Sequence, residues 1–259
     1  DSMPFHVKGS VEATMHYIKE TNNTAFLNKK IIFLQGSPVL ENLNGIKTGR
    51  LSGIIAHYTP AFLRKNTMPS WEVNCIEDWE KKVEKISKQT LKEEMAAIGG
   101  IPPWVVMYFE KLISLSGKKT ISEIFPDFTL FVYGGVNFAP YKNVFNKLIG
   151  KNIDSIEYYP ASEGFFAYQD SQKNEGLLMQ LNSGIFYEFI EVLEMSKNNP
   201  KRLSIKEVEL NKNYVLIIST NAGLWGYNTG DTVAFVSLSP YRIIVTGRYK
   251  HFISAFGEH

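Results

Sequence analysis

Residues 128–164 read FTLFVYGGVNFAPYKNVFNKLIGKNIDSIEYYPASEG, and this stretch decides the fold class. The apolar run over 128–133 ends in two glycines, which predicts a buried strand followed by a turn. A helix is predicted over 140–148, with Gly150 just past its end, and the next strand over 155–159. Strand, helix and strand in this order indicate a parallel βαβ unit.

The same alternation extends toward the N-terminus. Apolar residues at helical spacing or in short runs predict four helices over 7–18, 51–64, 76–94 and 103–115, and two strands over 30–35 and 95–98. We therefore expect an α/β fold with a mostly parallel, doubly wound sheet in this part of the chain.

The pattern changes after Glu163. Strand-like runs are separated by polar turns without a long helical segment, and they cover 165–169, 177–182, 185–192, 214–220, 232–237 and 241–246. This predicts an antiparallel region, either barrel-like or a meander. We expect an α/β subdomain over 1–164, a β-rich subdomain over 165–259 and a loop or short linker over 194–202.

Composition excludes several classes of protein. The 259 residues include 44% of hydrophobic types, and the formal net charge is only +2, which gives no electrostatic footprint for nucleic acid and no polybasic membrane patch. No apolar run reaches the roughly 20 residues of a membrane helix, and the N-terminus has no signal-peptide pattern. With the single cysteine Cys75, an internal disulfide framework is impossible. We expect a soluble, cytoplasmic protein; its oligomeric state stays open.

Familiar catalytic and metal motifs are missing. The five histidines do not pair with one another or with Cys75 at metal-ligand spacing. The sequence has no G-x-S-x-G elbow, no G-x-x-x-x-G-K-[ST] loop and no G-x-G-x-x-G fingerprint.

Two segments follow predicted strands and carry residues suited to a nucleotide. Gly134 and Gly135 would let a flat ligand approach the backbone, although an ordinary turn explains them equally well. After the strand over 155–159, Tyr159 could stack on a purine, Ser162 could donate to a phosphate, and Glu163 could hold Mg²⁺. A polar loop is the alternative reading of this second segment.

The third segment is Tyr227-Asn-Thr-Gly-Asp231, followed after a hairpin by Arg248. An aspartate after a glycine turn can accept both hydroxyls of a ribose, and an arginine offers a fork of donors to phosphate. A turn aspartate and a surface arginine are the alternative. Each segment alone is a weak signal, but their combination and order favour a nucleotide site.

These segments resemble motifs of the acyl-adenylate-forming superfamily, and most closely the bacterial branch of the auxin-responsive-promoter (Gretchen Hagen) family of acyl-acid amido synthetases. Residues 159–163 match its Y-x-x-S-E motif, and 227–231 match Y-x-x-G-D. Residues 246–258 match the G-R-x-K-x-x-I…G-E stretch, and the glycine pair at 134–135 matches the adenine-side segment.

The resemblance implies a ligase that uses ATP and Mg²⁺. A carboxylic acid and ATP give an acyl-adenylate and pyrophosphate, and an amine, usually an amino acid, then attacks to form an amide. The implied roles are adenine binding by Gly134, Gly135 and Tyr159, phosphate contact by Ser162, Mg²⁺ binding by Glu163, ribose binding by Asp231, ribose or α-phosphate contact by Arg248, and a hinge at Lys250. Glu163 and Arg248 are the implied catalytic residues.

Two departures from the family pattern lead us to expect a fragment. The family's phosphate loop should precede Asp1, and Met3 stands where a basic residue is often found. The C-terminal domain with its catalytic lysine should follow Glu258. We therefore expect the chain alone to be inactive. Two other interpretations stay open, a degenerate relative that binds nucleotide or acid without chemistry and an acyl-coenzyme A ligase.

The acyl pocket is less well defined by the sequence. Phe138, Phe165 and Phe166 border the expected site, and an aromatic lining would suit an aromatic or indolic acid. Plain core packing explains these three residues equally well.

Overall fold

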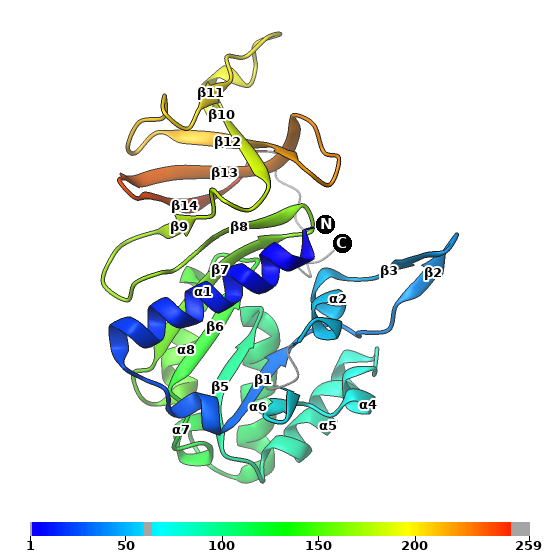
Figure 1. Cartoon of the computed structure of the whole chain (residues 1–259). Coiled ribbons are helices and arrows are strands. Elements are labelled where there is room, and N and C mark those ends of the chain that lie inside the picture. Colours follow the sequence, from blue (N-terminus) through cyan, green and yellow to red (C-terminus); the bar gives the residue numbers. More distant parts are fainter. Residues whose placement is uncertain (1, 60–63, 250–259) are drawn as a thin grey trace. The chain divides into compact units, whose positions relative to one another are not determined.

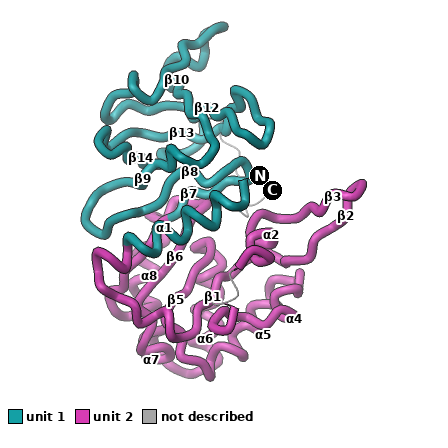
Figure 2. The backbone as a smooth tube through the Cα atoms, in the orientation of Figure 1, with its two compact units in different colours: residues 1–16, 158–259 teal, residues 17–157 magenta. Residues whose placement is uncertain are grey.

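The computed structural model describes residues 2–59 and 64–249, which form two compact units (Figure 2). One unit comprises residues 17–157, and the other comprises residues 1–16 and 158–259. The long helix α1 (Met3–Thr21) and the strand β7 (Asp154–Ala161) each contribute residues to both units. The subdomain boundary between residues 164 and 165 stays a prediction.

The unit of residues 17–157 contains a parallel sheet (Figure 1). Its strands are ordered β6 (Leu130–Gly134), β5 (Met95–Gly100), β1 (Lys30–Leu34) and β4 (Thr67–Met68). The helices are α2 (Leu51–His57), α4 (Trp71–Asn74), α5 (Trp79–Thr90), α6 (Pro102–Ser116), α7 (Ile121–Ile124) and α8 (Lys142–Ile149), with short 3₁₀ turns η1 (Ala25–Asn28) and η2 (Ala139–Tyr141). This parallel arrangement confirms the α/β fold class.

One face of this sheet packs against α5, α6 and α8. Ile32, Ile98 and Phe131 alternate with residues of the opposite face and are fully or almost fully buried. Facing them are apolar side chains of the three helices, among them Ile86, Phe109 and Phe145. The helix ends are set locally: Asp78 accepts a hydrogen bond from the amide of Lys81 at the start of α5, and Gly150 takes a left-handed conformation (φ +79°) after α8.

The other unit contains an antiparallel sheet. Its strands are ordered β11 (Leu203–Ser204), β10 (Ile185–Glu191), β12 (Asn213–Thr220), β13 (Tyr227–Leu238), β14 (Tyr241–Arg248), β9 (Leu177–Met179), β8 (Gly164–Tyr168) and β7, with the turn η3 (Val192–Glu194) after β10. The predicted antiparallel region is confirmed. Each strand pairs in antiparallel fashion with the next strand in this order.

The core of this sheet is aromatic. Phe189, Tyr214 and Phe235 lie edge to face with ring centroids 5.1–6.1 Å apart. The start of α1 covers β8, where Gly9 lies against the ring of Phe165 so closely that a Cβ on Gly9 would stand 2.5 Å from Phe165 Cδ1. Glycine is therefore required at this helix position by close approach.

Some predicted boundaries are wrong. The helix expected over 51–64 ends at His57, and residues 60–63 lie outside the described part of the chain. The helix expected over 76–94 begins at Trp79, after its Asp78 cap. The loop or short linker expected over 194–202 is confirmed as a loop, because residues 195–202 have no helix or strand and lie within one unit. A hairpin of β2 (Glu41–Leu43) and β3 (Ile46–Thr48) was not predicted, although its Asn44-Gly45 turn, with both φ values positive, is a strong hairpin signal.

Candidate functional site

Three of the predicted nucleotide-binding residues meet in the antiparallel unit. The Tyr159 hydroxyl on β7 donates to Asp231 Oδ2 at 2.7 Å, and Arg248 Nε at the end of β14 donates to Asp231 Oδ1 at 2.8 Å. Each carboxylate oxygen of Asp231 therefore accepts one hydrogen bond. A carboxylate has about four acceptor positions, so further donors can still bind.

An irregularity in β13 aims Asp231 at these partners. The sequence predicts a turn over the motif at 227–231, but the structure places it within β13, which begins five residues earlier than predicted. Gly230 has φ +78°, and the pairing of β13 with β12 shifts register here. The Asn228 side chain accepts from the Gly230 amide, and the Thr229 hydroxyl accepts from the Asp231 amide. Such bulges re-aim side chains.

Tyr159, Asp231 and Arg248, here called the cluster, interact electrostatically. The hydrogen bond and charge of Asp231 raise the pKa of the Arg248 guanidinium. Burial raises the pKa of the Tyr159 hydroxyl well above its usual value, and the nearby Asp231 carboxylate raises it further. Tyr159 therefore stays a neutral donor, Arg248 stays a cation, and the Arg248 side chain is 50% exposed beside an Asp231 side chain that is 15% exposed.

Ser162 and Glu163 form the tight connection between β7 and β8, in which Ala161 pairs with Gly164. The Glu163 carboxylate raises the pKa of Tyr227 through its charge and a side-chain hydrogen bond, and it also acts electrostatically on Arg248. Tyr227 thus belongs to the cluster, although it is not among the residues predicted for the site. Its position in the Y-x-x-G-D motif was the available signal.

Other predicted residues belong to the unit of residues 17–157 or lie outside the described part of the chain. In the unit of residues 17–157, β6 ends at Gly134, and Gly135 follows with φ +80°. Phe138 packs against Tyr133, with ring centroids 4.6 Å apart. Lys250, the predicted hinge, lies outside the described residues, as do Asp1 and Glu258.

Phe165 and Phe166 are buried on opposite faces of β8. Phe165 contacts His6 and Tyr158 beneath α1, whereas Phe166 lies edge-on to Tyr159 and packs in the aromatic core. This burial agrees with the core-packing alternative, and a role in acyl binding stays a prediction.

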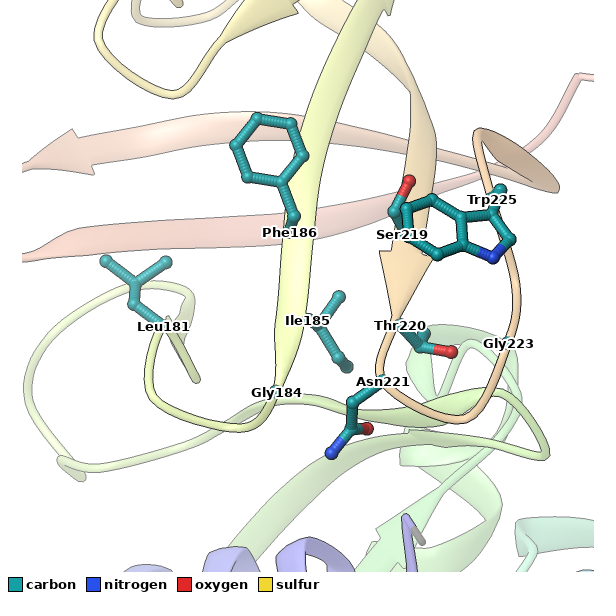
Figure 3. A pocket seen from close by; sticks show the side chains of 9 residues that line it. All are labelled: Leu181, Gly184, Ile185, Phe186, Ser219, Thr220, Asn221, Gly223 and Trp225. Atoms are coloured by element: carbon teal, nitrogen blue, oxygen red, sulfur yellow. The ribbon is translucent and has the colours of Figure 1, made fainter.

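A groove in the same antiparallel unit carries exposed aromatic surface (Figure 3). Phe186 on β10 is 63% exposed, and Trp225 in the loop before β13 is 84% exposed. Ile185 also lines the groove, but its side chain is buried in the aromatic core, and its Cδ1 stands 2.6 Å from where a Cβ on Gly164 would lie. The complete lining is Leu181, Gly184, Ile185, Phe186, Ser219, Thr220, Asn221, Gly223 and Trp225.

The described residues contain no cluster of three or more His, Cys, Asp or Glu side chains that could hold a metal ion. Glu163 could hold Mg²⁺ only together with oxygen ligands from elsewhere, which fits the way Mg²⁺ is usually bound, through one or two carboxylates plus substrate phosphates. Within residues 2–59 and 64–249, no helix has the length and apolar character needed to cross a membrane.

Comparisons with known proteins confirm the resemblance to acyl-acid amido synthetases, whereas the bacterial branch and the fragment status stay predictions. Residues 178–248, which include Asp231 and Arg248, match the GH3 family central domain. The fold is similar to that of GH3.15 acyl acid amido synthetase, with TM-score 0.74, 12% identity, and coverage of 96% of this chain and 54% of that one. A second structure, AtGH3.15 acyl acid amido synthetase in complex with 2,4-DB, gives TM-score 0.73, 12% identity, and coverage of 95% and 52%.

The fold is also similar to that of 2-hydroxyisobutyryl-CoA ligase in complex with 2-HIB-AMP and CoA, with TM-score 0.60, 12% identity, and coverage of 92% and 47%. The chain therefore spans about half the length of these solved structures. A comparison with curated proteins gives no match.

Proposed function

We propose that this chain is the nucleotide-binding part of an ATP-dependent acyl-acid ligase that forms an acyl-adenylate and passes the acyl group to an amine. The observation that carries the proposal is the carboxylate of Asp231 held between Tyr159 and Arg248, within a strand pair that matches the GH3 family central domain. The activity, the acid and the amine of the whole protein are all part of the proposal.

The cluster is suited to a ribose phosphate. The free acceptor positions of Asp231 would take ribose hydroxyls. Because Arg248 bonds to Asp231 through Nε, its two Nη groups remain available on a half-exposed side chain for a phosphate oxygen. A charged fork placed in this way would stabilise negative charge that develops at the α-phosphate.

Glu163 is the residue that we propose for Mg²⁺. The bound ion would neutralise phosphate charge during attack by an anionic carboxylate. Ser162, exposed in the same two-residue turn, would donate its hydroxyl to a phosphate oxygen. Tyr227 would keep the Glu163 carboxylate oriented.

The proposed chemistry balances in two steps. A carboxylate oxygen bonds to the α-phosphorus of ATP while the bond to the β-phosphate oxygen breaks and pyrophosphate leaves. An amine nitrogen then bonds to the acyl carbon, the bond to AMP breaks, and the nitrogen gives up a proton. For the acyl group we propose the aromatic groove of Phe186 and Trp225, because it offers exposed apolar surface and because Ile185, one of its lining residues, lies close to Gly164, the neighbour of Glu163.

Ligand-dependent thermal stability tests the proposal. Mg-ATP at about 100 times its dissociation constant should stabilise the chain by roughly 2.7 kcal/mol, and Asp231→Ala should remove this effect. Asp170→Asn is the matched control, because Asp170 pairs with Arg242 away from the cluster. A stabilisation that survives in Asp231→Ala, or that is absent from the unmodified chain, would contradict the proposed site.

Product analysis with the full gene product separates the alternatives. Mass spectrometry should detect an amide when the reaction contains an acid, Mg-ATP and amino acids. A thioester formed with coenzyme A instead would favour the acyl-coenzyme A ligase, and ATP binding without pyrophosphate exchange over a broad acid panel would favour a non-catalytic relative.

A further inference from the structure

We infer that the Tyr159 hydroxyl is a positioning group that sets selectivity for ribose over deoxyribose. This inference rests on the proposed nucleotide site and adds to it a role for one hydroxyl group. Tyr159 acts through Asp231 and does not itself touch the sugar.

The geometry around Asp231 supports this role. Its two oxygens are tied to different elements, Oδ2 to Tyr159 on β7 and Oδ1 to Arg248 on β14. Together these bonds fix the rotation of the carboxylate about its Cβ–Cγ bond. The acceptor positions that remain, at least one on each oxygen, then point in set directions and can take the 2′- and 3′-hydroxyls of a ribose at the same time.

Burial makes the hydrogen bond from Tyr159 to Asp231, here called the tether, rigid. Tyr159 is 7% exposed, its ring lies 5.1 Å from Phe166 at an interplanar angle of 76°, and it belongs to the aromatic core of its unit. The hydroxyl is thus held by a side chain that cannot change rotamer without disturbing the core. The hydroxyl is the part of Tyr159 that bonds to Asp231, and stacking of its ring on adenine stays a separate prediction.

The bond on the other side of Asp231 cannot replace this tether. Arg248 is half exposed, and its long side chain can follow the carboxylate if the carboxylate rotates. Removal of the Tyr159 hydroxyl therefore frees the carboxylate even though the Arg248 bond persists. A freed carboxylate still attracts a hydroxyl but no longer places two acceptors at fixed positions.

The test compares the affinities of the chain for Mg-ATP and for Mg-2′-deoxy-ATP by calorimetry. We expect the unmodified chain to prefer ATP by about 10-fold or more, since a hydrogen bond to a charged group contributes about that much. In Tyr159→Phe the preference should fall to about 3-fold or less. Tyr187→Phe is the matched control, because Tyr187 is equally buried but its hydroxyl bonds to the Gln180 carbonyl, and it should keep the preference.

A second variant covers the case in which Tyr159→Phe does not fold. Asp231→Glu keeps the negative charge but moves the carboxylate past the Tyr159 hydroxyl, and it should also lose the preference. A Tyr159→Phe variant that folds and retains the 10-fold preference would overturn the inference and leave the proposed function standing. Absence of any ATP binding by the unmodified chain would overturn both.

Discussion

Arg248 Nε donates to Asp231 Oδ1 at 2.8 Å, and the two residues are also direct register partners in the β13–β14 ladder. The ladder thus places the arginine and the aspartate opposite each other, and the bulge at Gly230 turns the aspartate toward the arginine.

Arg248→Lys should weaken Mg-ATP binding about 10-fold or more, because lysine has no planar fork to bond a carboxylate and a phosphate together. Calorimetric titration measures this loss. Arg242→Lys, in the structural pair with Asp170, should leave the affinity unchanged.

The Glu163 charge is the largest of several influences that raise the pKa of Tyr227. Glu163→Gln removes this charge, so it should lower the pKa of the Tyr227 hydroxyl toward its usual value. Ultraviolet titration of phenolate formation, with Tyr227→Phe subtracted in each background, isolates this one hydroxyl. If the Tyr227 pKa is the same in Glu163→Gln, the two side chains do not interact and Tyr227 does not belong to the cluster.

The aromatic core of the antiparallel unit should be sensitive to truncation. Phe235→Ala removes a fully buried ring that contacts Phe189, Tyr214 and Tyr241, and it should lower the free energy of unfolding by about 3–5 kcal/mol. The control is Phe186→Ala, on the exposed groove, which should change stability by less than about 0.5 kcal/mol. Urea denaturation measures both, and equal effects would contradict the core assignment.

Close packing of α1 on β8 gives a paired prediction. Gly9→Ala places a methyl group against the ring of Phe165 and should destabilise the chain by about 1–3 kcal/mol. Phe165→Leu makes room for that methyl, so the double variant should be more stable than the sum of the two single effects predicts. Strict additivity in thermal unfolding would show that the two positions do not touch.

His6 makes stability depend on pH. It is 1% exposed, neither ring nitrogen has a partner among the described residues, and burial lowers its pKa to about 4. The unfolded chain, with a pKa near 6.5, binds a proton that the folded chain excludes. The free energy of unfolding therefore loses nothing to His6 above about pH 6.5, and it falls as the pH drops toward 4.

His6→Phe should flatten this dependence, because phenylalanine does not titrate. Unfolding free energies measured between pH 7 and 4 should fall by about 3 kcal/mol less in His6→Phe than in the unmodified chain. Parallel pH profiles for the two proteins would contradict the burial of a neutral His6.

Local patterns in the sequence determined the secondary structure of the chain. The apolar run before Gly134 and the glycine after α8 were sufficient to predict strand, helix and turn, because periodicity, left-handed caps and glycine turns are properties of neighbouring residues. The same patterns gave the change from parallel to antiparallel sheet. The motif order gave the resemblance to the acyl-acid amido synthetases.

Only the tertiary structure decided how the motif residues bond to one another. The Tyr159 and Asp231 contact joins residues 72 apart in sequence, and it depends on the strand order β13–β14–β9–β8–β7 and on a bulge inside β13. Likewise, α1 begins the chain but its first part packs with the C-terminal unit, where Phe165 lies over Gly9. Such contacts are set by strand register and side-chain packing, which are non-local and leave no period in the sequence.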